Sequence, residues 1–297
     1  MLSYLHAFHA GNFADVQKHG ALALVQTMMR AKASGIACFD THAGSAIYDL
    51  RSERARKTGE ADHGVQRLWG ARDRLLSGDW KPFLDVLKGF NAGGGELSVY
   101  PGSPAWFQHF LRDGDALTLF ELHPSEGEQL AEWASEAPIR VLRQDGLAGL
   151  LRQLPPRQPR LLTLIDPSYE VKTDYIEVAQ TLGKAWHKCR HGIFLVWYPI
   201  LTSGLQEQLK DAVRGTDARK ILCSEVHLNN PPERGMVGSG MLVVNPPWGF
   251  DSRFAAMMSD VAGADALHLS PDLGWLGPEE LKGRQHREER GWKKNKT

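Results

Sequence analysis

The chain has 297 residues, 42% of them hydrophobic and 24% charged, which is enough to bury the core of one large domain or two small ones. Lys and Arg together number 35, as do Asp and Glu, so the zero net charge excludes nucleic-acid binding through overall charge and leaves only a local basic patch. Three scattered cysteines argue against a disulfide framework or a zinc cluster. Because no stretch resembles a signal peptide or a membrane span of about 20 apolar residues, we expect a cytoplasmic protein without a membrane partner.

The first predicted element is a helix over residues 12–33, where apolar side chains recur with roughly helical spacing. Asn12 or Asp15 is the candidate cap at its start. A short apolar run at residues 36–39 follows and ends at Asp40. This run is typical of a buried strand.

Residues 47–100 differ in composition from the segments on either side. They contain many arginines mixed with acids, apolar side chains suited to short amphipathic helices, and a glycine run at residues 93–95. We interpret them as a small helical insertion.

Strand-like runs then alternate with helical stretches. The runs cover residues 117–120, 139–142, 161–165, 193–197, 221–228 and 241–244. Alternation of this kind predicts an α/β fold with a mostly parallel sheet that helices cover on both faces. The last two strands are separated only by a loop, so we expect an antiparallel pair at or near one edge of the sheet.

The resulting domain division has a main domain over residues 1–46 and 101–270, the insertion at 47–100, and a charged C-terminal tail at 271–297. The end of the tail is either a solvated segment or a basic arm that contacts phosphate. The basic side chains available to such an arm are Arg287, Arg290, Lys293, Lys294 and Lys296.

Four consecutive predicted strands end in or near an acid: Asp40, Glu121, Asp145 and Asp166. Any one of them alone is best explained as a charge where a strand meets water. Four together point to a ligand beyond the carboxyl ends of the strands. A carboxylate at Glu121 suits the two hydroxyls of a ribose, and one at Asp145 suits the exocyclic amine of an adenine.

Asp40 begins the segment DTHAG, which contains neither a dinucleotide fingerprint nor a phosphate-binding loop. The missing glycine fingerprint disfavours a nicotinamide dehydrogenase. An adenosine cofactor whose phosphates need no glycine-rich loop fits better, and S-adenosylmethionine is such a cofactor.

The segment Asp166-Pro167-Ser168-Tyr169 follows the apolar run LLTLI. For methyl transfer to an exocyclic amine, the Asp carboxylate and the carbonyl of the next residue can hold the two N–H bonds while the nitrogen attacks. Pro167 stiffens the turn, and the ring of Tyr169 can stack on a base that has left its helix. The segment alone is also compatible with an ordinary turn.

A competing motif, Asn245-Pro246-Pro247-Trp248, follows the later apolar run MLVV. By itself it looks more like an amine-methylating motif than DPSY does. Its place at the end of the last strand in the series predicts a position away from the four acids, so we favour Asp166 as the catalytic residue.

In these motifs the sequence resembles the RlmJ family, bacterial enzymes that methylate the exocyclic amine of an adenine in 23S ribosomal RNA. The resemblance covers about residues 1–250. The motifs, in the expected order, are MLSYLHAFHAGNFADVQKH, DTHAG, YPGSP, ELHPSE, DPSYEVKTDY, WYPI and GSGMLVVNPPW.

The resemblance implies a Rossmann-like class I methyltransferase fold with a small helical insertion, S-adenosylmethionine as donor, S-adenosylhomocysteine as product, and no metal. It implies that Asp166, with Pro167 and Tyr169, forms the catalytic segment, and that Tyr4 meets the RNA. The implied cofactor contacts are Lys18, His19, His42, Ser103, Glu121, Asp145, Gly146 and Asp166. The family usually has proline where this chain has Ser168, a change that the proposed roles tolerate.

The histidines His6, His9, His19 and His42 raise the alternative of a metal site, but no Cys or paired acid completes a set near them. We expect the partner to be 23S RNA, either protein-free or in an early assembly intermediate, and the enzyme to act as a monomer. We also expect the insertion to help bind this RNA through Arg51, Arg54 and Arg56. The alternatives are methylation of a DNA adenine or of a protein side-chain amide on the same fold. A non-catalytic RNA-binding module is a further alternative, which the intact set of acids disfavours.

Overall fold

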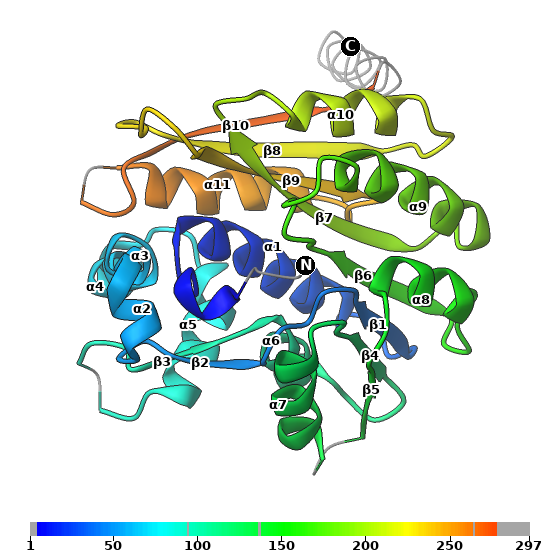
Figure 1. Cartoon of the computed structure of the whole chain (residues 1–297), viewed down its shortest axis with the longest axis horizontal. Coiled ribbons are helices and arrows are strands. Elements are labelled where there is room, and N and C mark those ends of the chain that lie inside the picture. The colour runs from blue at the N-terminus through cyan, green and yellow to red at the C-terminus, as the bar shows by residue number, and fades with distance from the viewer. Residues whose placement is uncertain (1–4, 94, 136–137, 264, 278–297) are drawn as a thin grey trace, which may run out of the picture.

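The computed structural model describes residues 5–93, 95–135, 138–263 and 265–277. Within this part of the chain, eight strands form one sheet in the order β10-β8-β9-β7-β6-β1-β4-β5 (Figure 1). The strands are β1 (Ile36–Asp40), β4 (Ala116–Phe120), β5 (Ile139–Leu142), β6 (Arg160–Ile165), β7 (Ile193–Leu201), β8 (Ile221–Leu228), β9 (Met236–Val244) and β10 (Leu269–Trp275). The sheet therefore contains all seven strands that the sequence predicts, and one more.

The sheet has a parallel part and an antiparallel part. Strands β5, β4, β1, β6 and β7 are parallel, and the chain order reverses at β1, which lies between β4 and β6. Strand β9 pairs antiparallel with both β7 and β8, which confirms the predicted antiparallel pair. The ligand site of such a sheet is expected beyond the carboxyl ends of the parallel strands, near the point of reversal.

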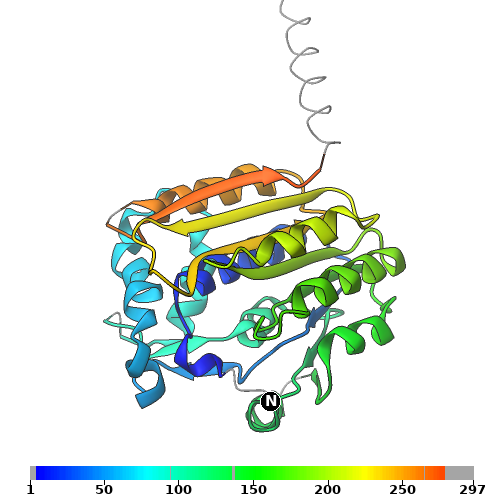
Figure 2. The same cartoon turned by 45° about the horizontal axis from the view of Figure 1, so that its top comes forward.

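Strand β10 forms the edge next to β8 (Figure 2). We expected the charged tail to begin at residue 271, whereas residues 271–275 belong to this strand. The segment LSPDLGW gives little sequence signal because proline, aspartate and glycine are all rare in strands. Pro271 is tolerated because an edge strand has no neighbour on its outer side that needs the missing N–H. Residues 278–297, with the arginines and lysines of the tail, lie outside the described residues.

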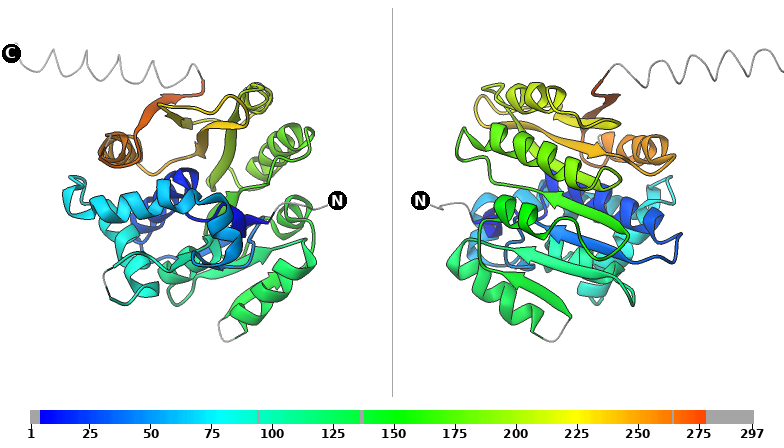
Figure 3. Two further views of the ribbon diagram at one scale, coloured as in Figure 1. Left: turned by 60° about the vertical axis from the view of Figure 1, so that its left-hand side comes forward. Right: turned by 90° about the vertical axis from the view of Figure 1, so that its right-hand side faces the viewer.

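Alternating side chains of each strand enter two separate hydrophobic clusters, so both faces of the sheet are buried. One face packs against α1 (Phe13–Met29), α6 (Ser103–Phe110) and α11 (Phe250–Ala262). The other packs against α8 (Gly146–Gln153), α9 (Asp174–Lys188) and α10 (Gln206–Arg214), which face the viewer in the right panel of Figure 3. Helix α7 (Pro124–Ala134) packs on β5. Helices on both faces confirm the predicted α/β architecture.

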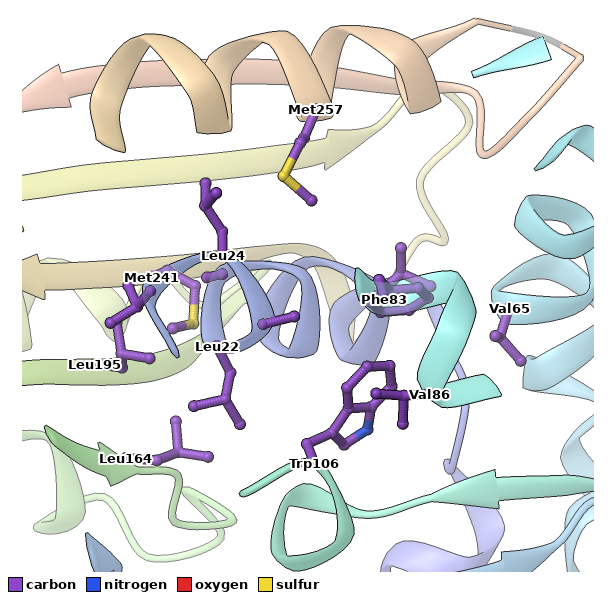
Figure 4. Close-up of a cluster of buried hydrophobic side chains, with 14 of the residues drawn as sticks. Leu22, Leu24, Val65, Phe83, Val86, Trp106, Leu164, Leu195, Met241 and Met257 are labelled. Carbon is purple, nitrogen blue, oxygen red and sulfur yellow. The ribbon is translucent and has the colours of Figure 1, made fainter. Parts of the chain in front are cut away.

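Helix α1 is buried almost all round because it lies between the sheet and the helices of the insertion. Leu22 and Leu24 sit in the same cluster as Leu195 and Met241 of the sheet and as Phe83 of the insertion (Figure 4). The helix begins after Asn12, whose side chain accepts from the Asp15 N–H at 2.9 Å, so Asn12 is the cap. Burial of this kind fixes the helix firmly and makes it a rigid carrier for the polar residues of its first turns.

The segment expected to be a helical insertion contains α2 (Glu53–Thr58), α3 (Glu60–His63), α4 (Val65–Ala71), the 3-10 turn η2 (Arg72–Arg74) and α5 (Trp80–Phe90). Two short strands that the sequence did not indicate, β2 (Ile47–Asp49) and β3 (Val99–Pro101), pair antiparallel and bring its two ends together. Its status as a separate subdomain stays a prediction. None of the helices in the described ranges is long and apolar enough to cross a membrane.

Candidate active site

A cavity of about 430 Å³ opens at the carboxyl ends of the parallel strands, beside the point where the strand order reverses. Its wall is built from the segments that follow β1, β4 and β6, from the start of α1 and the segment before it, and from the insertion. Eight of the predicted site residues line it: Lys18, His19, His42, Ser103, Glu121, Asp166, Pro167 and Tyr169. The sheet thus brings together side chains that lie up to about 150 positions apart in the sequence.

Asp166 follows the last residue of β6, and its carboxylate is paired with Lys18 on α1. The Lys18 Nζ lies 2.5 Å from Asp166 Oδ2 and 2.9 Å from Asp15 Oδ1. Burial raises the pKa of Asp166 above its usual range, although Lys18 opposes this shift. Burial lowers the pKa of Lys18, but the two carboxylates outweigh it and raise that pKa, so Lys18 stays charged.

Asp15 is buried and connects Lys18 to the N-terminal turn η1 (His6–Phe8). Its Oδ2 lies 3.0 Å from His6 Nε2 and accepts from the Gly11 N–H at 2.8 Å. Burial alone raises the pKa of Asp15, yet His6 and Lys18 together hold it well below its usual range. The sequence suggested Asp15 only as a helix cap. Its place in the site was missed, because nothing in the local sequence shows that its neighbour Lys18 also pairs with the distant Asp166.

Tyr169 is only 6% exposed, and its backbone adopts the left-handed conformation with φ of 54°. Its hydroxyl donates to the Trp197 carbonyl at 2.8 Å, and its ring packs 4.5 Å from that of Tyr175. Trp197, at the middle of β7, also lines the cavity, and Lys18 Nζ lies 5.6 Å from its ring centre. Sequence reasoning placed only Tyr169 as an aromatic wall and missed Trp197, although the motif WYPI contains it.

Glu121 follows β4 at the opposite side of the point of reversal. Its Oε2 accepts from the Gly44 N–H at 2.8 Å, and its Oε1 accepts from the His123 N–H at 2.7 Å. Burial raises the pKa of Glu121, while these backbone N–H groups oppose the shift. Next to it, the Ser45 hydroxyl donates to Glu126, a second buried carboxylate of the cavity wall that the sequence did not single out. The loop after β1 is therefore fastened to the segment after β4.

Asp145 and Gly146 do not line the cavity wall. Asp145 caps α8 by accepting from the Ala148 N–H at 2.7 Å, and an added Cβ on Gly146 would overlap the Thr41 carbonyl oxygen. The glycine therefore lets α8 approach the loop after β1. His42 in that loop is hydrogen bonded to the Thr41 hydroxyl at 2.8 Å. Burial lowers the pKa of His42 to about 4, so its ring is neutral at pH 7.

Two buried polar atoms at the site have no partner among the described residues: His19 Nε2 and Asp40 Oδ2. The other nitrogen of His19, Nδ1, lies 2.6 Å from the Tyr100 hydroxyl, which leaves Nε2 for a ligand. Burial lowers the pKa of His19 well below its usual range, so this ring too is neutral. Tyr4, the expected RNA contact, lies outside the described residues.

Within the described ranges, no group of three or more His, Cys, Asp and Glu side chains is arranged to hold a metal ion. His6 and His9 are instead hydrogen bonded to carboxylates, His6 to Asp15 and His9 to Glu60 at 2.7 Å.

The motif Asn245–Trp248 lies beyond the amino ends of the parallel strands, whereas Asp166 lies beyond their carboxyl ends. Because β9 runs antiparallel to β7, its last residue, Val244, pairs with Phe194 near the start of β7. The Asn245 side chain donates to the Arg190 and Gly192 carbonyls at 2.9 and 2.8 Å, and Trp248 is 88% exposed. The expectation that this motif is remote from the four acids is confirmed.

A family model described as ribosomal RNA large subunit methyltransferase D, RlmJ, matches residues 33–264, which is more than half of the chain. The chain belongs to this family. Two relatives named ribosomal RNA large subunit methyltransferase J, from Escherichia coli K12 and Haemophilus influenzae Rd, are each 38% identical to it. The first match covers 94% of this chain and 100% of the relative, and the second covers 87% and 92%.

A crystal structure of a protein from Legionella pneumophila is 33% identical and superposes with a TM-score of 0.83, covering 90% of this chain and 98% of the other. The fold is the Rossmann-like class I methyltransferase fold that the sequence predicted, and the chain is a methyltransferase of the RlmJ family. Family and fold imply S-adenosylmethionine as the methyl donor.

The polar groups of the cavity fit S-adenosylmethionine. Glu121 presents a carboxylate for ribose hydroxyls, with one lone pair of each oxygen left after its backbone contacts. His19 Nε2 is buried and unpaired among the described residues, so it can meet a polar atom at the amino-acid end of the donor. Asp166, at the other side of the reversal point, faces the same cavity.

Proposed function

We propose that this chain transfers a methyl group from S-adenosylmethionine to the exocyclic N6 amine of an adenine in 23S ribosomal RNA. The observation that carries the proposal is the position of Asp166 and Pro167, side by side in the wall of the cavity at the end of β6. The names of the two relatives, each 38% identical, support ribosomal RNA of the large subunit as the substrate.

Asp166 and Pro167 supply the two acceptors that such an amine needs. Lys18 occupies Asp166 Oδ2, which leaves Oδ1 for one N–H of the amine. No N–H of a described residue donates to the Pro167 carbonyl, so this oxygen is free for the second N–H. Held in this way, the amine nitrogen turns its lone pair toward the methyl group, which is catalysis by positioning and electrostatics.

S-adenosylmethionine supplies a sulfonium-bound methyl group and leaves as S-adenosylhomocysteine. The new N–CH₃ bond forms as the S–CH₃ bond breaks, and the amine must then lose one proton. The carboxylate of Asp166 is suited to take up that proton because burial raises its pKa. Lys18 keeps the carboxylate ionised beforehand. The indole of Trp197 and the ring of Tyr169 give this part of the cavity the aromatic surface that an extruded base requires.

The remaining assignments from the resemblance are part of the proposal. Lys18, His19, His42, Ser103 and Glu121 serve the cofactor from the cavity wall, and Asp145 and Gly146 serve it from the start of α8, which packs against the loop after β1 beside His42. Tyr4 serves the RNA. We propose a monomer that acts on protein-free RNA or an early assembly intermediate.

The proposal is tested by incubating the protein with cofactor and protein-free 23S RNA, assembled subunits, duplex DNA or protein, followed by mass spectrometry of the products. Of these four substrates, we expect only the protein-free 23S RNA to acquire N6-methyladenosine. Asp166→Ala, which removes the side-chain acceptor, should bind cofactor within about threefold of wild type by calorimetry but lose at least about 100-fold in turnover. Methylation of DNA or of a protein amide in place of the RNA would replace the substrate assignment, and full turnover by Asp166→Ala would refute the catalytic one.

A further inference from the structure

The insertion contributes one carboxylate, Glu60, to the wall of the cavity. Glu60 begins α3, and both of its oxygens contact the segment that precedes α1. Its Oε1 lies 2.7 Å from His9 Nδ1, and its Oε2 accepts from Asn12 Nδ2 at 2.9 Å. The hydrogen bond to Glu60 raises the pKa of His9 above its usual range.

The same segment is fastened to the insertion at further points. The Thr58 hydroxyl donates to the Phe8 carbonyl, and the Val65 N–H donates to the Gly11 carbonyl at 2.7 Å. An added Cβ on Gly64 would overlap the Gly11 carbonyl oxygen, so the two backbones are in direct contact. The position of residues 8–12 is therefore set by α2, α3 and α4.

A continuous series of polar contacts leads from Glu60 to Asp166. Asn12, which donates to Glu60, also caps α1 through the Asp15 N–H at 2.9 Å. Asp15 contacts Lys18 at 2.9 Å, and Lys18 contacts Asp166 at 2.5 Å. Because α1 is rigid and buried, a displacement of its cap also displaces the Lys18 ammonium from the Asp166 carboxylate.

We propose that Glu60 is a positioning residue for Asp166. Through Asn12 and His9 it sets the start of α1, and through Asp15 and Lys18 it sets the placement of the catalytic carboxylate. The inference rests on the proposed function of Asp166. It gives the insertion a role in the chemical step, in addition to the RNA binding that its arginines predict.

The test compares Glu60→Gln with Asp62→Asn, a matched change of carboxylate to amide on the same helix. Gln carries no charge and offers one acceptor oxygen in place of two, so it cannot accept from His9 Nδ1 and from Asn12 Nδ2 on separate oxygens. Asp62 is exposed and does not line the cavity, so its variant is the control. With saturating RNA and cofactor, we expect the single-turnover rate constant to fall about tenfold in Glu60→Gln and to stay within about twofold in the control. Equal rate constants in the two variants would overturn the proposal.

A double-mutant cycle with Lys18→Met shows whether Glu60 acts through Lys18. If it does, Glu60→Gln causes no further loss in the Lys18→Met background, because the contact that it positions is already absent. Losses that multiply would show that Glu60 acts independently of Lys18 and would overturn the proposed route. Dissociation constants for the cofactor should change by less than about threefold on Glu60→Gln, because all the proposed cofactor residues except Lys18 lie outside the series of contacts.

A measurement without turnover separates failure of this inference from failure of the proposed function. The pKa of the Asp166 carboxyl is followed by ¹³C NMR in wild type, Glu60→Gln and Asp62→Asn. Since Lys18 lowers this pKa, a looser contact raises it, and we expect a rise of about 0.5 or more in Glu60→Gln alone. An unchanged pKa contradicts the positioning role even if the RNA is methylated. A raised pKa supports it even if the substrate proves to be another amine.

Discussion

Asp40 has a carboxyl group in surroundings that disfavour its charged form. It ends β1 fully buried, with one oxygen accepting from the His42 N–H at 3.3 Å and the other without a partner among the described residues. Burial raises its pKa to about 7, against the smaller lowering effect of the Ser103 hydroxyl. A buried carboxyl group with a raised pKa, held next to Ser103 and His42 of the cavity wall, is typical of a functional site.

The pH dependence of stability tests this environment. Because the pKa of Asp40 is about 7 in the folded chain and about 3.9 in an unfolded one, the folded state retains a proton that the unfolded state releases. Its contribution to stability is fully present below about pH 4 and is lost as the pH rises to about 7, by up to about 4 kcal/mol. Asp40→Asn removes this dependence. Urea unfolding between pH 4.5 and 7.5 should show wild type losing free energy of unfolding relative to Asp40→Asn.

The control is Asp113→Asn, which alters an exposed carboxylate. Its curve should run parallel to that of wild type over the same range. If the curve of Asp40→Asn is also parallel to wild type, then the buried carboxyl does not titrate in this range and its raised pKa is wrong.

At the scale of elements, the predictions from sequence succeeded where the signal was local. Apolar runs ending in acids located β1, β4, β5 and β6, since parallel strands place their carboxyl ends at one edge. Strand β10 was missed because its stability comes from pairing with β8 and not from its own composition. Glu60 was missed because its role depends on partners 48 and 51 positions away. Spacing in the sequence carries no information on such contacts.

The loop after β9 offers a prediction at this scale, because it contains the motif that most resembles a catalytic one. Asn245 has φ of 52°, which Asn adopts more readily than Ala, and its side chain holds two carbonyls of the loop before β7. We expect Asn245→Ala to lower the free energy of unfolding by about 1–3 kcal/mol while turnover stays within about twofold. Urea unfolding and single-turnover rates, both measured well below the unfolding transition, give the two values.

Asp166→Ala should show the reverse pattern, with turnover lost and the fold retained. If Asn245→Ala instead loses turnover while it stays folded and binds cofactor, the catalytic role belongs to the motif Asn245–Trp248 that follows β9.

At the scale of the whole molecule, zero net charge means that affinity for RNA must come from one part of the surface. The insertion is the candidate, because Arg51, Arg54 and Arg56 are exposed on α2 and just before it. Helix α2 packs against η1, the turn that carries His6 toward the cavity (Figure 1). RNA bound there would lie next to the segment that Glu60 fastens, so binding and positioning would involve the same helices.

Replacing the three arginines with Gln should therefore weaken RNA binding and reduce its dependence on salt. Each phosphate contact contributes about 0.7–0.9 to the slope of log affinity against log salt concentration, so three lost contacts reduce the slope by about 2–3. Filter binding of a 23S fragment between 50 and 300 mM salt measures the slope. The matched control replaces Arg157, Lys184 and Arg190, three exposed cations in the α8–α9 region of the other face. If both triple variants show the same slope, the phosphates are not held by the insertion, and its contribution reduces to the positioning that Glu60 provides.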